Sequence, residues 1–388
     1  MGAIDQDLKR TKKRAAEFNS AIRTYSMVVA IILLWAIFAY TTDGVFLEAR
    51  NFSNLMRQST ITAILSVGML MVIVTGHIDL SVGSLVGLAG GVAAVSQTWL
   101  GWGPAPSILA ALATGLFIGA LQGSLVAYLN IPSFIVTLGG LLACRGAIKG
   151  ITQGNTIPVE IPAFKSIGQS YIAPAAGSAL AIVAVLTIVS AVLLKERSRR
   201  RHGLGSRSLF RVAAHALVPS SLVVTFVLAL NRYAGVPVPV LILLVVALVG
   251  AIVTEGTVFG RYLYATGGNA DAARLSGVDI RRHALAAFSV MGAMAGLASI
   301  IYTARVGSAA PDAGRLLELD AIAACVIGGT SLMGGRGSVQ GACLGALFMA
   351  SLDNGMSLEN YQDFTQDIVK GIILVTAVGL DIIGRRRG

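Results

Sequence analysis

The polar segment Gly76–Ser84 is the part of the sequence best suited to chemistry, because it lies between two long apolar stretches. Charged and hydroxyl groups are costly in a lipid bilayer, so Asp79, Ser81 and Ser84 should face protein or water rather than lipid. Ser81 and Ser84 are three residues apart, which places them on one face of a helix. The pattern predicts a broken or newly starting helix that lines a polar path.

The same segment has a simpler interpretation. Asp79 stands two residues before Ser81, an N-cap-like arrangement for a helix that opens at Val82. On this view the segment is a short cytoplasmic turn with a capping aspartate. The residues alone leave both interpretations open.

The elements that position this segment are predicted from composition. Of the 388 residues, 55% are hydrophobic and only 13% are charged, whereas a soluble protein carries roughly 25% charged residues. Several apolar stretches reach the ~20 residues that a helix needs to cross a bilayer, and lipid permits no other open-chain structure. We therefore expect an all-α, polytopic membrane helix bundle, with residues 1–388 forming a single transmembrane domain.

The chain has 45 glycines, and many recur at a spacing of four residues. Such rows of small residues allow membrane helices to approach closely. We therefore predict close helix packing along four rows: Gly83, Gly87 and Gly91; Gly115, Gly119 and Gly123; Gly292 and Gly296; Gly337, Gly341 and Gly345.

The formal net charge of +11 reflects basic clusters that flank apolar stretches, namely Lys9–Arg23, Lys195–Arg211, Arg261–Arg282 and Arg385–Arg387. The positive-inside rule assigns such clusters to the cytoplasm, where they can also contact anionic membrane lipid. This distribution argues against a nucleic-acid partner.

Membrane topology follows from the two ends. The N-terminal segment 1–25 and the tail 384–388 are both predicted to be cytoplasmic, which requires an even number of crossings. Nine spans precede residue 305, and the last span must start outside. The apolar stretch Ala321–Met356 is interrupted at Gly334–Gly337. It must therefore enter the membrane from the outer side and return to that side, as two short spans or as a re-entrant pair. The bundle then has ten to twelve crossings.

A polar segment, 257–283, is predicted to be a cytoplasmic coupling loop. Asn269 is a suitable N-cap, Ala270–Ser276 favours a short helix, and Gly277 is a suitable stop signal. The functional interpretation is a docking helix for a soluble partner. The alternative is a plain connecting helix.

At these residues the chain resembles the permease subunits of bacterial ABC importers for ribose, galactose, arabinose and xylose. The motifs that carry the resemblance occur in the family's order, and they are Gly76–Ser84, Ile131–Gly140, Gly267–Ile280 and Leu319–Gly335. The chain is most similar to the xylose-type members, through Thr41–Gly44, Gly235–Pro237, Ser351–Ser357 and the extra basic central loop. His77 departs from the family pattern, in which a small or acidic residue is usual.

The resemblance implies a multi-pass protein of the bacterial inner membrane that imports a monosaccharide, D-xylose or a related pentose, by alternating access. It implies a permease homodimer, a periplasmic sugar-binding protein and a separate cytoplasmic ATP-binding subunit. The residues matching the ATPase-coupling segment are Gly268, Asn269, Ala272, Ala273, Arg274, Ser276 and Gly277. The candidate substrate-path residues are Asp79, Ser81, Ser84, Asn130, Ser133, Thr137, Thr330, Ser331 and Asn354.

The sequence does not favour an enzyme. It lacks the phosphate loop G-x-x-x-x-G-K-[ST], so ATP hydrolysis is expected on a separate chain. Cys144, Cys325 and Cys343 show no ligand spacing, and we expect no metal and no cofactor. The alternative function is an ion-coupled secondary carrier for a small polar solute. Such a carrier would need carboxylates buried within its spans, and the apolar stretches hold almost none.

Overall fold

The computed structural model describes residues 27–202 and 208–386. The predicted N-terminal segment 1–25 and the last two residues of the predicted tail lie outside this part. Within the described residues, seven helices are long and apolar enough to cross a membrane: α2 (Ala49–Val74), α4 (Pro104–Leu129), α5 (Ser133–Ile151), α7 (Pro174–Arg201), α8 (Leu209–Asn231), α9 (Val238–Ala251) with η2 (Ile252–Gly256), and α12 (Ile280–Val306). Two shorter apolar helices are Met27–Thr41 and α3 (Val82–Thr98). The predicted all-α polytopic membrane bundle is confirmed.

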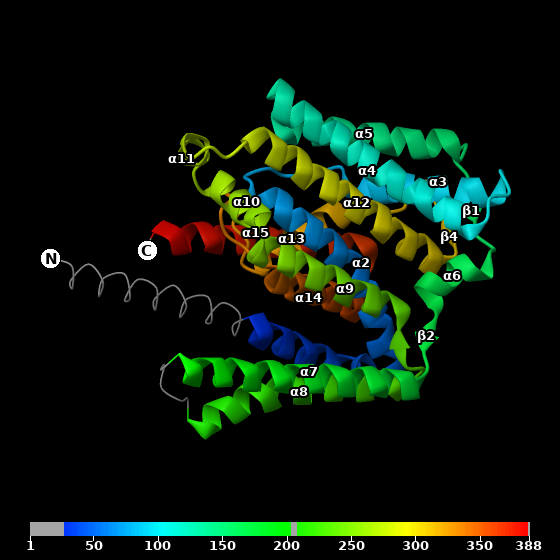
Figure 1. The fold of residues 1–388 in the computed structure, drawn as a ribbon. Coiled ribbons are helices and arrows are strands. Elements are labelled where there is room, and N and C mark those ends of the chain that lie inside the picture. The colour runs from blue at the N-terminus through cyan, green and yellow to red at the C-terminus, as the bar shows by residue number, and fades with distance from the viewer. Residues whose placement is uncertain (1–26, 203–207, 387–388) are drawn as a thin grey trace.

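The two ends of the bundle carry different elements (Figure 1). At one end lie α10 (Val258–Gly268), α11 (Ala270–Leu275) and the C-terminal end of α15 (Asp363–Arg386). At the other end lie η1 (Val45–Leu47), α6 (Pro162–Gln169) and two short antiparallel pairs, β1 (Ile157–Pro158) with β4 (Ser308–Ala309) and β2 (Tyr171–Ile172) with β3 (Val236–Pro237). We call these the α11 end and the β end.

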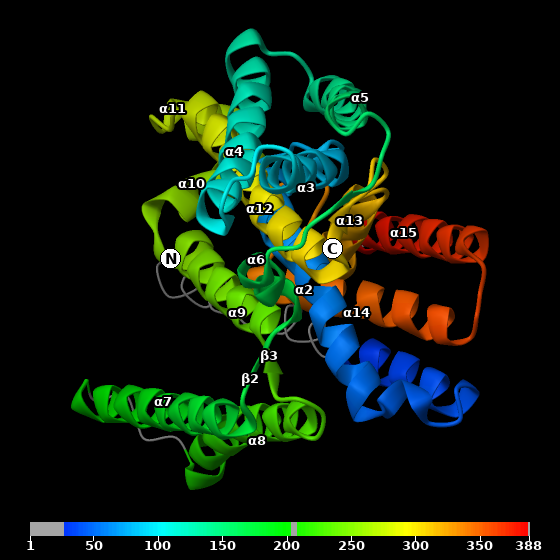
Figure 2. The ribbon, with the colours of Figure 1, turned by 90° about the vertical axis from the view of Figure 1, so that its right-hand side faces the viewer.

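Burial separates the central helices from the outer ones. In the most apolar 18 residues of α2, 89% of the residues are buried inside the protein, whereas the corresponding share is 11% in α7 and 6% in α8. The α7–α8 hairpin lies to one side of the other helices (Figure 2). The hairpin is therefore a peripheral element, and α2 forms the centre of the core.

The predicted glycine rows do mark close helix packing. Gly115 and Gly119 of α4 face Gly292 and Gly296 of α12, and a Cβ atom added to Gly115 would lie 2.8 Å from the backbone nitrogen of Gly296. Real Cβ atoms essentially never come that close. Only glycine therefore permits the observed crossing of α4 and α12.

The predicted apolar stretch Ala321–Met356 is interrupted in the structure, as expected. The helix α13 (Leu317–Ile327) has 11 residues, which at 1.5 Å per residue cover roughly 16 Å, about half of a hydrocarbon core. The non-helical segment 328–338 follows, and α14 (Val339–Leu358) then runs for 20 residues. The break begins at Gly328 and includes the predicted interruption at Gly334–Gly337.

The segment 257–283 was predicted to be a loop that contains one short helix. In the structure it is largely helical. The helix α10 begins after Thr257, whose side-chain oxygen accepts a hydrogen bond of 3.1 Å from the N–H of Gly260. Leu263 and Thr266 of α10 are buried. This helix is stabilised by packing against distant residues, which the polar appearance of the segment does not reveal.

Candidate functional site

The segment 75–81 between α2 and α3 is non-helical, and within it Thr75, Asp79 and Ser81 are buried. The Asp79 side chain is 1% exposed, and its Oδ1 accepts hydrogen bonds from the Ser81 N–H (2.8 Å) and the Ser81 hydroxyl (2.7 Å). Ser84 is also buried and donates its hydroxyl to the Ser81 carbonyl at 2.7 Å. These contacts hold the start of α3, as predicted for a newly starting helix.

The first turn of α5 packs against this segment. Ser133 Oγ accepts a 3.4 Å hydrogen bond from the Ile78 N–H, and the Thr137 hydroxyl lies 3.4 Å from the Ile78 carbonyl. From α4, Gln122 places its Oε1 3.0 Å from the Ser81 hydroxyl. Five predicted path residues therefore lie together, and we call Asp79, Ser81, Ser84, Ser133 and Thr137, with Gln122, the α3-start cluster. Sequence reasoning missed Gln122, although a single buried amide in an apolar helix is a signal that could have found it.

The other predicted path residues lie elsewhere. Thr330 and Ser331 are buried in the break between α13 and α14, whereas Asn130 is exposed where α4 ends, with φ at 53°. Asn354 exchanges two side-chain hydrogen bonds, of 2.8 and 3.0 Å, with Asn51 in the first turn of α2. That turn is roughly 35 Å from Val74, the other end of α2, at 1.5 Å per residue, so Asn354 belongs to the β end.

His77 lies next to the α3-start cluster, with its ring centroid 5.9 Å from that of Phe288 on α12. Burial lowers the pKa of His77 from its ordinary value of 6.5. The imidazole is therefore neutral at pH 7, and the segment carries no positive charge beside Asp79.

The predicted coupling helix is confirmed as a structure. Asn269 Oδ1 accepts a 2.9 Å hydrogen bond from the Ala272 N–H, and Gly277 ends the helix with φ at +83°. Of the predicted coupling residues only Ala273 is buried, and the following are exposed: Gly268, Asn269, Ala272, Arg274, Ser276 and Gly277. Sequence reasoning missed Leu275, which is 89% exposed and gives this surface an apolar tip.

The helix α11 connects to the centre of the bundle through α10. A Cβ atom on Gly267 would overlap the carbonyl oxygen of Val74, the last residue of α2. The N–H of Gly335 donates to the same oxygen at 2.9 Å, and the Tyr264 hydroxyl donates to the Gly337 carbonyl at 3.0 Å. A displacement of α10 and α11 would therefore act on the end of α2 and on the α13–α14 break together.

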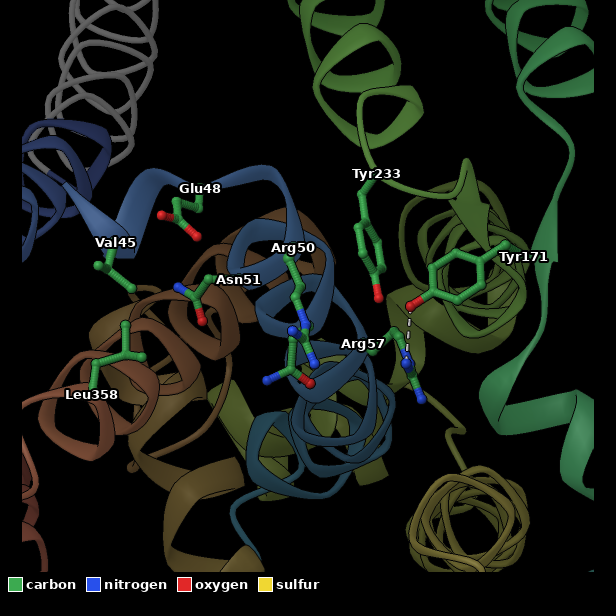
Figure 3. Close-up of a pocket in the computed structure, with 9 residues that line it drawn as sticks. Val45, Glu48, Arg50, Asn51, Arg57, Tyr171, Tyr233 and Leu358 are labelled. Carbon is green, nitrogen blue, oxygen red and sulfur yellow. Dashed lines mark hydrogen bonds between the residues drawn. The ribbon is translucent and has the colours of Figure 1, made fainter.

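A cavity of about 500 Å³ opens at the β end, between the start of α2, the strands β2 and β3 and the end of α14 (Figure 3). The Arg57 Nη1 donates a 2.9 Å hydrogen bond to the Tyr171 hydroxyl, and its guanidinium carbon lies 5.6 Å from that ring's centroid. Tyr171 and Tyr233 meet edge to face with centroids 5.9 Å apart. We call this space the outer cavity.

Comparison with known proteins agrees with this architecture. The family model described as branched-chain amino acid transport system / permease component matches residues 51–378. The chain is 47% identical over 366 residues to the xylose transport system permease protein XylH of Escherichia coli (strain K12), covering 94% of this chain and 93% of that one. The XylH of Haemophilus influenzae is 44% identical, with coverage of 94% and 98%. The ribose import permease protein RbsC of Escherichia coli (strain K12) is 35% identical, with coverage of 91% and 92%. No solved structure matches the chain. The extent of these matches shows that the chain belongs to the branched-chain amino acid transport system / permease component family.

Proposed function

We propose that the chain is the permease subunit of an ATP-driven importer that carries D-xylose or a related pentose from the periplasm to the cytoplasm. The observation that carries this proposal is the 47% identity to a xylose permease over 94% of the chain, against 35% to a ribose permease. The difference favours xylose over ribose as the sugar.

The α3-start cluster supports a path for an uncharged polar solute. It offers hydroxyl and amide groups around one carboxylate that is already engaged by Ser81. A sugar needs donors and acceptors rather than a strong opposite charge, and weak contacts allow it to leave again. We therefore retain Asp79, Ser81, Ser84, Ser133 and Thr137 as path residues, and we add Gln122.

The exposed helix α11 is the proposed docking site for a separate ATP-binding subunit. Its exposed Arg274 suits a protein partner, because arginine is a typical anchor of interfaces, and the exposed Leu275 adds apolar surface beside it. Gly267 transmits the displacement to Val74 and Gly335. Alternating access would follow as a rigid-body shift of the attached helices.

The α11 end is the proposed cytoplasmic end, because the basic cluster Arg261–Arg282 lies there and positive charge favours that side. Segments 1–25 and 384–388 would then be cytoplasmic, and the β end would receive a periplasmic sugar-binding protein. The family resemblance supports a pair of permease chains in one importer, surrounded by membrane lipid.

The test is uptake of labelled D-xylose into liposomes that contain the permease alone or with its ATP-binding subunit and sugar-binding protein. We expect uptake only with all components and ATP. Uptake by the permease alone, driven by an ion gradient, would establish the secondary carrier instead. The buried carboxylates of α13 make this comparison necessary, since the spans were expected to hold almost none, whereas Glu318 is only 7% exposed and Asp320 only 6%.

A further inference from the structure

A second cavity, of about 270 Å³, lies between α2, α12, α13, α14 and α15. Its volume is just below the ~300–1,000 Å³ typical of sites for drug-sized molecules, which suits a ligand of monosaccharide size rather than a larger one. It is separate from the α3-start cluster and nearer the β end. We call it the inner cavity, because it lies deeper along α2 than the outer cavity.

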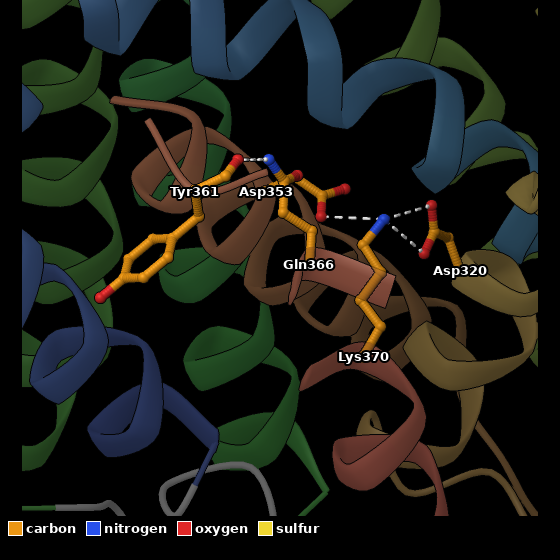
Figure 4. Close-up of polar contacts among 5 residues, drawn as sticks. All are labelled: Asp320, Asp353, Tyr361, Gln366 and Lys370. Carbon is orange, nitrogen blue, oxygen red and sulfur yellow. Dashed lines mark hydrogen bonds and ion pairs between the residues drawn. The ribbon is translucent and has the colours of Figure 1, made fainter. Parts of the chain in front are cut away.

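Four charged side chains line the inner cavity. The Lys370 Nζ lies 3.2 Å from Asp320 and 2.8 Å from Asp353, bridging helices α13, α14 and α15 (Figure 4). Arg305, at the end of α12, also lines it and forms no ion pair within the described part of the chain. Two carboxylates and two cations give the lining no net charge. A neutral cavity favours neither a free cation nor a free anion.

The remaining polar lining consists of hydroxyl and amide groups, which can both donate and accept hydrogen bonds. They belong to Gln58, Thr62, Tyr302, Ser357 and Gln366. The Gln366 Nε2 is held by the Tyr361 carbonyl at 2.9 Å (Figure 4). Such a lining matches a small ligand that carries several hydroxyl groups.

The polar residues of α2 lead into the inner cavity. Asn51, Asn54, Gln58 and Thr62 follow one another at intervals of three and four residues, which aligns them along one face of the helix. Asn51 and Asn54 line the outer cavity, whereas Gln58 and Thr62 line the inner one. The two cavities are therefore consecutive steps along a single polar face that runs inward from the β end.

We propose that the inner cavity is a monosaccharide-binding site on the entry side of the path, occupied before the sugar reaches the α3-start cluster. This inference rests on the proposed function, because it assigns a site to the same transported sugar. The charges of Asp320, Asp353 and Lys370 fix the three helices around the ligand, and the neutral groups contact its hydroxyls.

The test uses two substitutions that keep side-chain shape and remove one hydroxyl each, Tyr302→Phe and Thr62→Val. They are made in the complete importer in liposomes, and uptake of D-xylose is compared with uptake of its monodeoxy analogues. Loss of one hydrogen bond should reduce D-xylose uptake at limiting sugar about three- to tenfold. The same variant should lose nothing with the analogue that lacks the partner hydroxyl. Thr60→Val is the matched control, because Thr60 is buried on the same helix but does not line the cavity.

A purely structural role for the ion cluster, which consists of Asp320, Asp353 and Lys370, would give a different result. Tyr302→Phe and Thr62→Val would then transport every sugar at the normal rate, or lose all sugars equally with lower thermal stability, and either result overturns the site. Failure of the proposed function is recognised separately, because the wild-type importer would then transport no pentose at all.

Discussion

Replacing Gly267 by alanine should separate ATP hydrolysis from sugar transport. Gly267 is the point at which α10 meets α2, and its new Cβ atom would lie 2.8 Å from the Val74 carbonyl carbon and 3.0 Å from the Gly335 nitrogen, with the Val74 oxygen closer still. Ordinary contacts of a Cβ atom are 3.4–4 Å. The backbones would have to separate, and the 2.9 Å hydrogen bond from Gly335 to Val74 would be weakened or lost.

The magnitude follows from the cost of overpacking, which is typically about 1–3 kcal/mol. If the contact is close in only one of the transport states, that state loses roughly five- to 150-fold in population relative to the other. We therefore expect sugar uptake to fall at least about fivefold, because the cycle must pass through both states. ATP hydrolysis should persist, since α11 itself is unchanged.

The assay measures sugar uptake and ATP hydrolysis in the same liposomes. Gly256→Ala is the matched control, because Gly256 lies just before α10 and a Cβ atom there meets only a side-chain carbon of Ile252, at 3.9 Å. It should leave both rates near those of the wild type. If the alanine variants at 267 and 256 behave alike, the backbone contact does not transmit the movement of α11, and the reasoning is refuted.

Three further outcomes follow from the structure. Gly292→Ala should destabilise the protein by about 1–3 kcal/mol by overpacking, measured as a lower Tm in detergent, whereas Gly139→Ala, with nothing within 4 Å, should not. Asp79→Asn keeps an acceptor for Ser81 and should retain most uptake, whereas Asp79→Leu leaves the buried Ser81 N–H unpaired, at about 1–3 kcal/mol, and the Ser81 hydroxyl with Gln122 as its remaining acceptor, and should fail; equal uptake by both variants would make the segment a mere turn. Because burial lowers the pKa of His77, the unfolded chain binds more protons than the folded one below pH 6.5. Stability should thus fall as the pH drops through the folded pKa, and the Tm of His77→Gln should fall less over that range.

Local patterns in the sequence were predictive where neighbouring residues decide the structure. Asn269 and Gly277 delimit α11 through bonds and backbone angles that a few adjacent residues set. The glycine rows identified close packing, although not which helices would meet. The pairing of Asn51 with Asn354 joins residues 303 positions apart, and no local pattern indicates such a partner.

The ion cluster shows the same limit. Asp320 directly precedes the predicted apolar stretch Ala321–Met356, and it is buried in the first turn of α13 beside Lys370. A cation within reach stabilises a buried carboxylate, and for Asp320 that cation comes from another helix, α15. The helix α10 was missed for a related reason, since its support lies in Val74 and Gly335 rather than in its own sequence.

The central claim is that a separate ATP-binding subunit drives this permease through α11. Its most direct test is sugar-stimulated ATP hydrolysis by the complete importer carrying Arg274→Glu, a charge reversal at an exposed position of α11. The account predicts that this stimulation is abolished while the permease remains folded and inserted in the membrane. Stimulation at the wild-type level in that variant would contradict it.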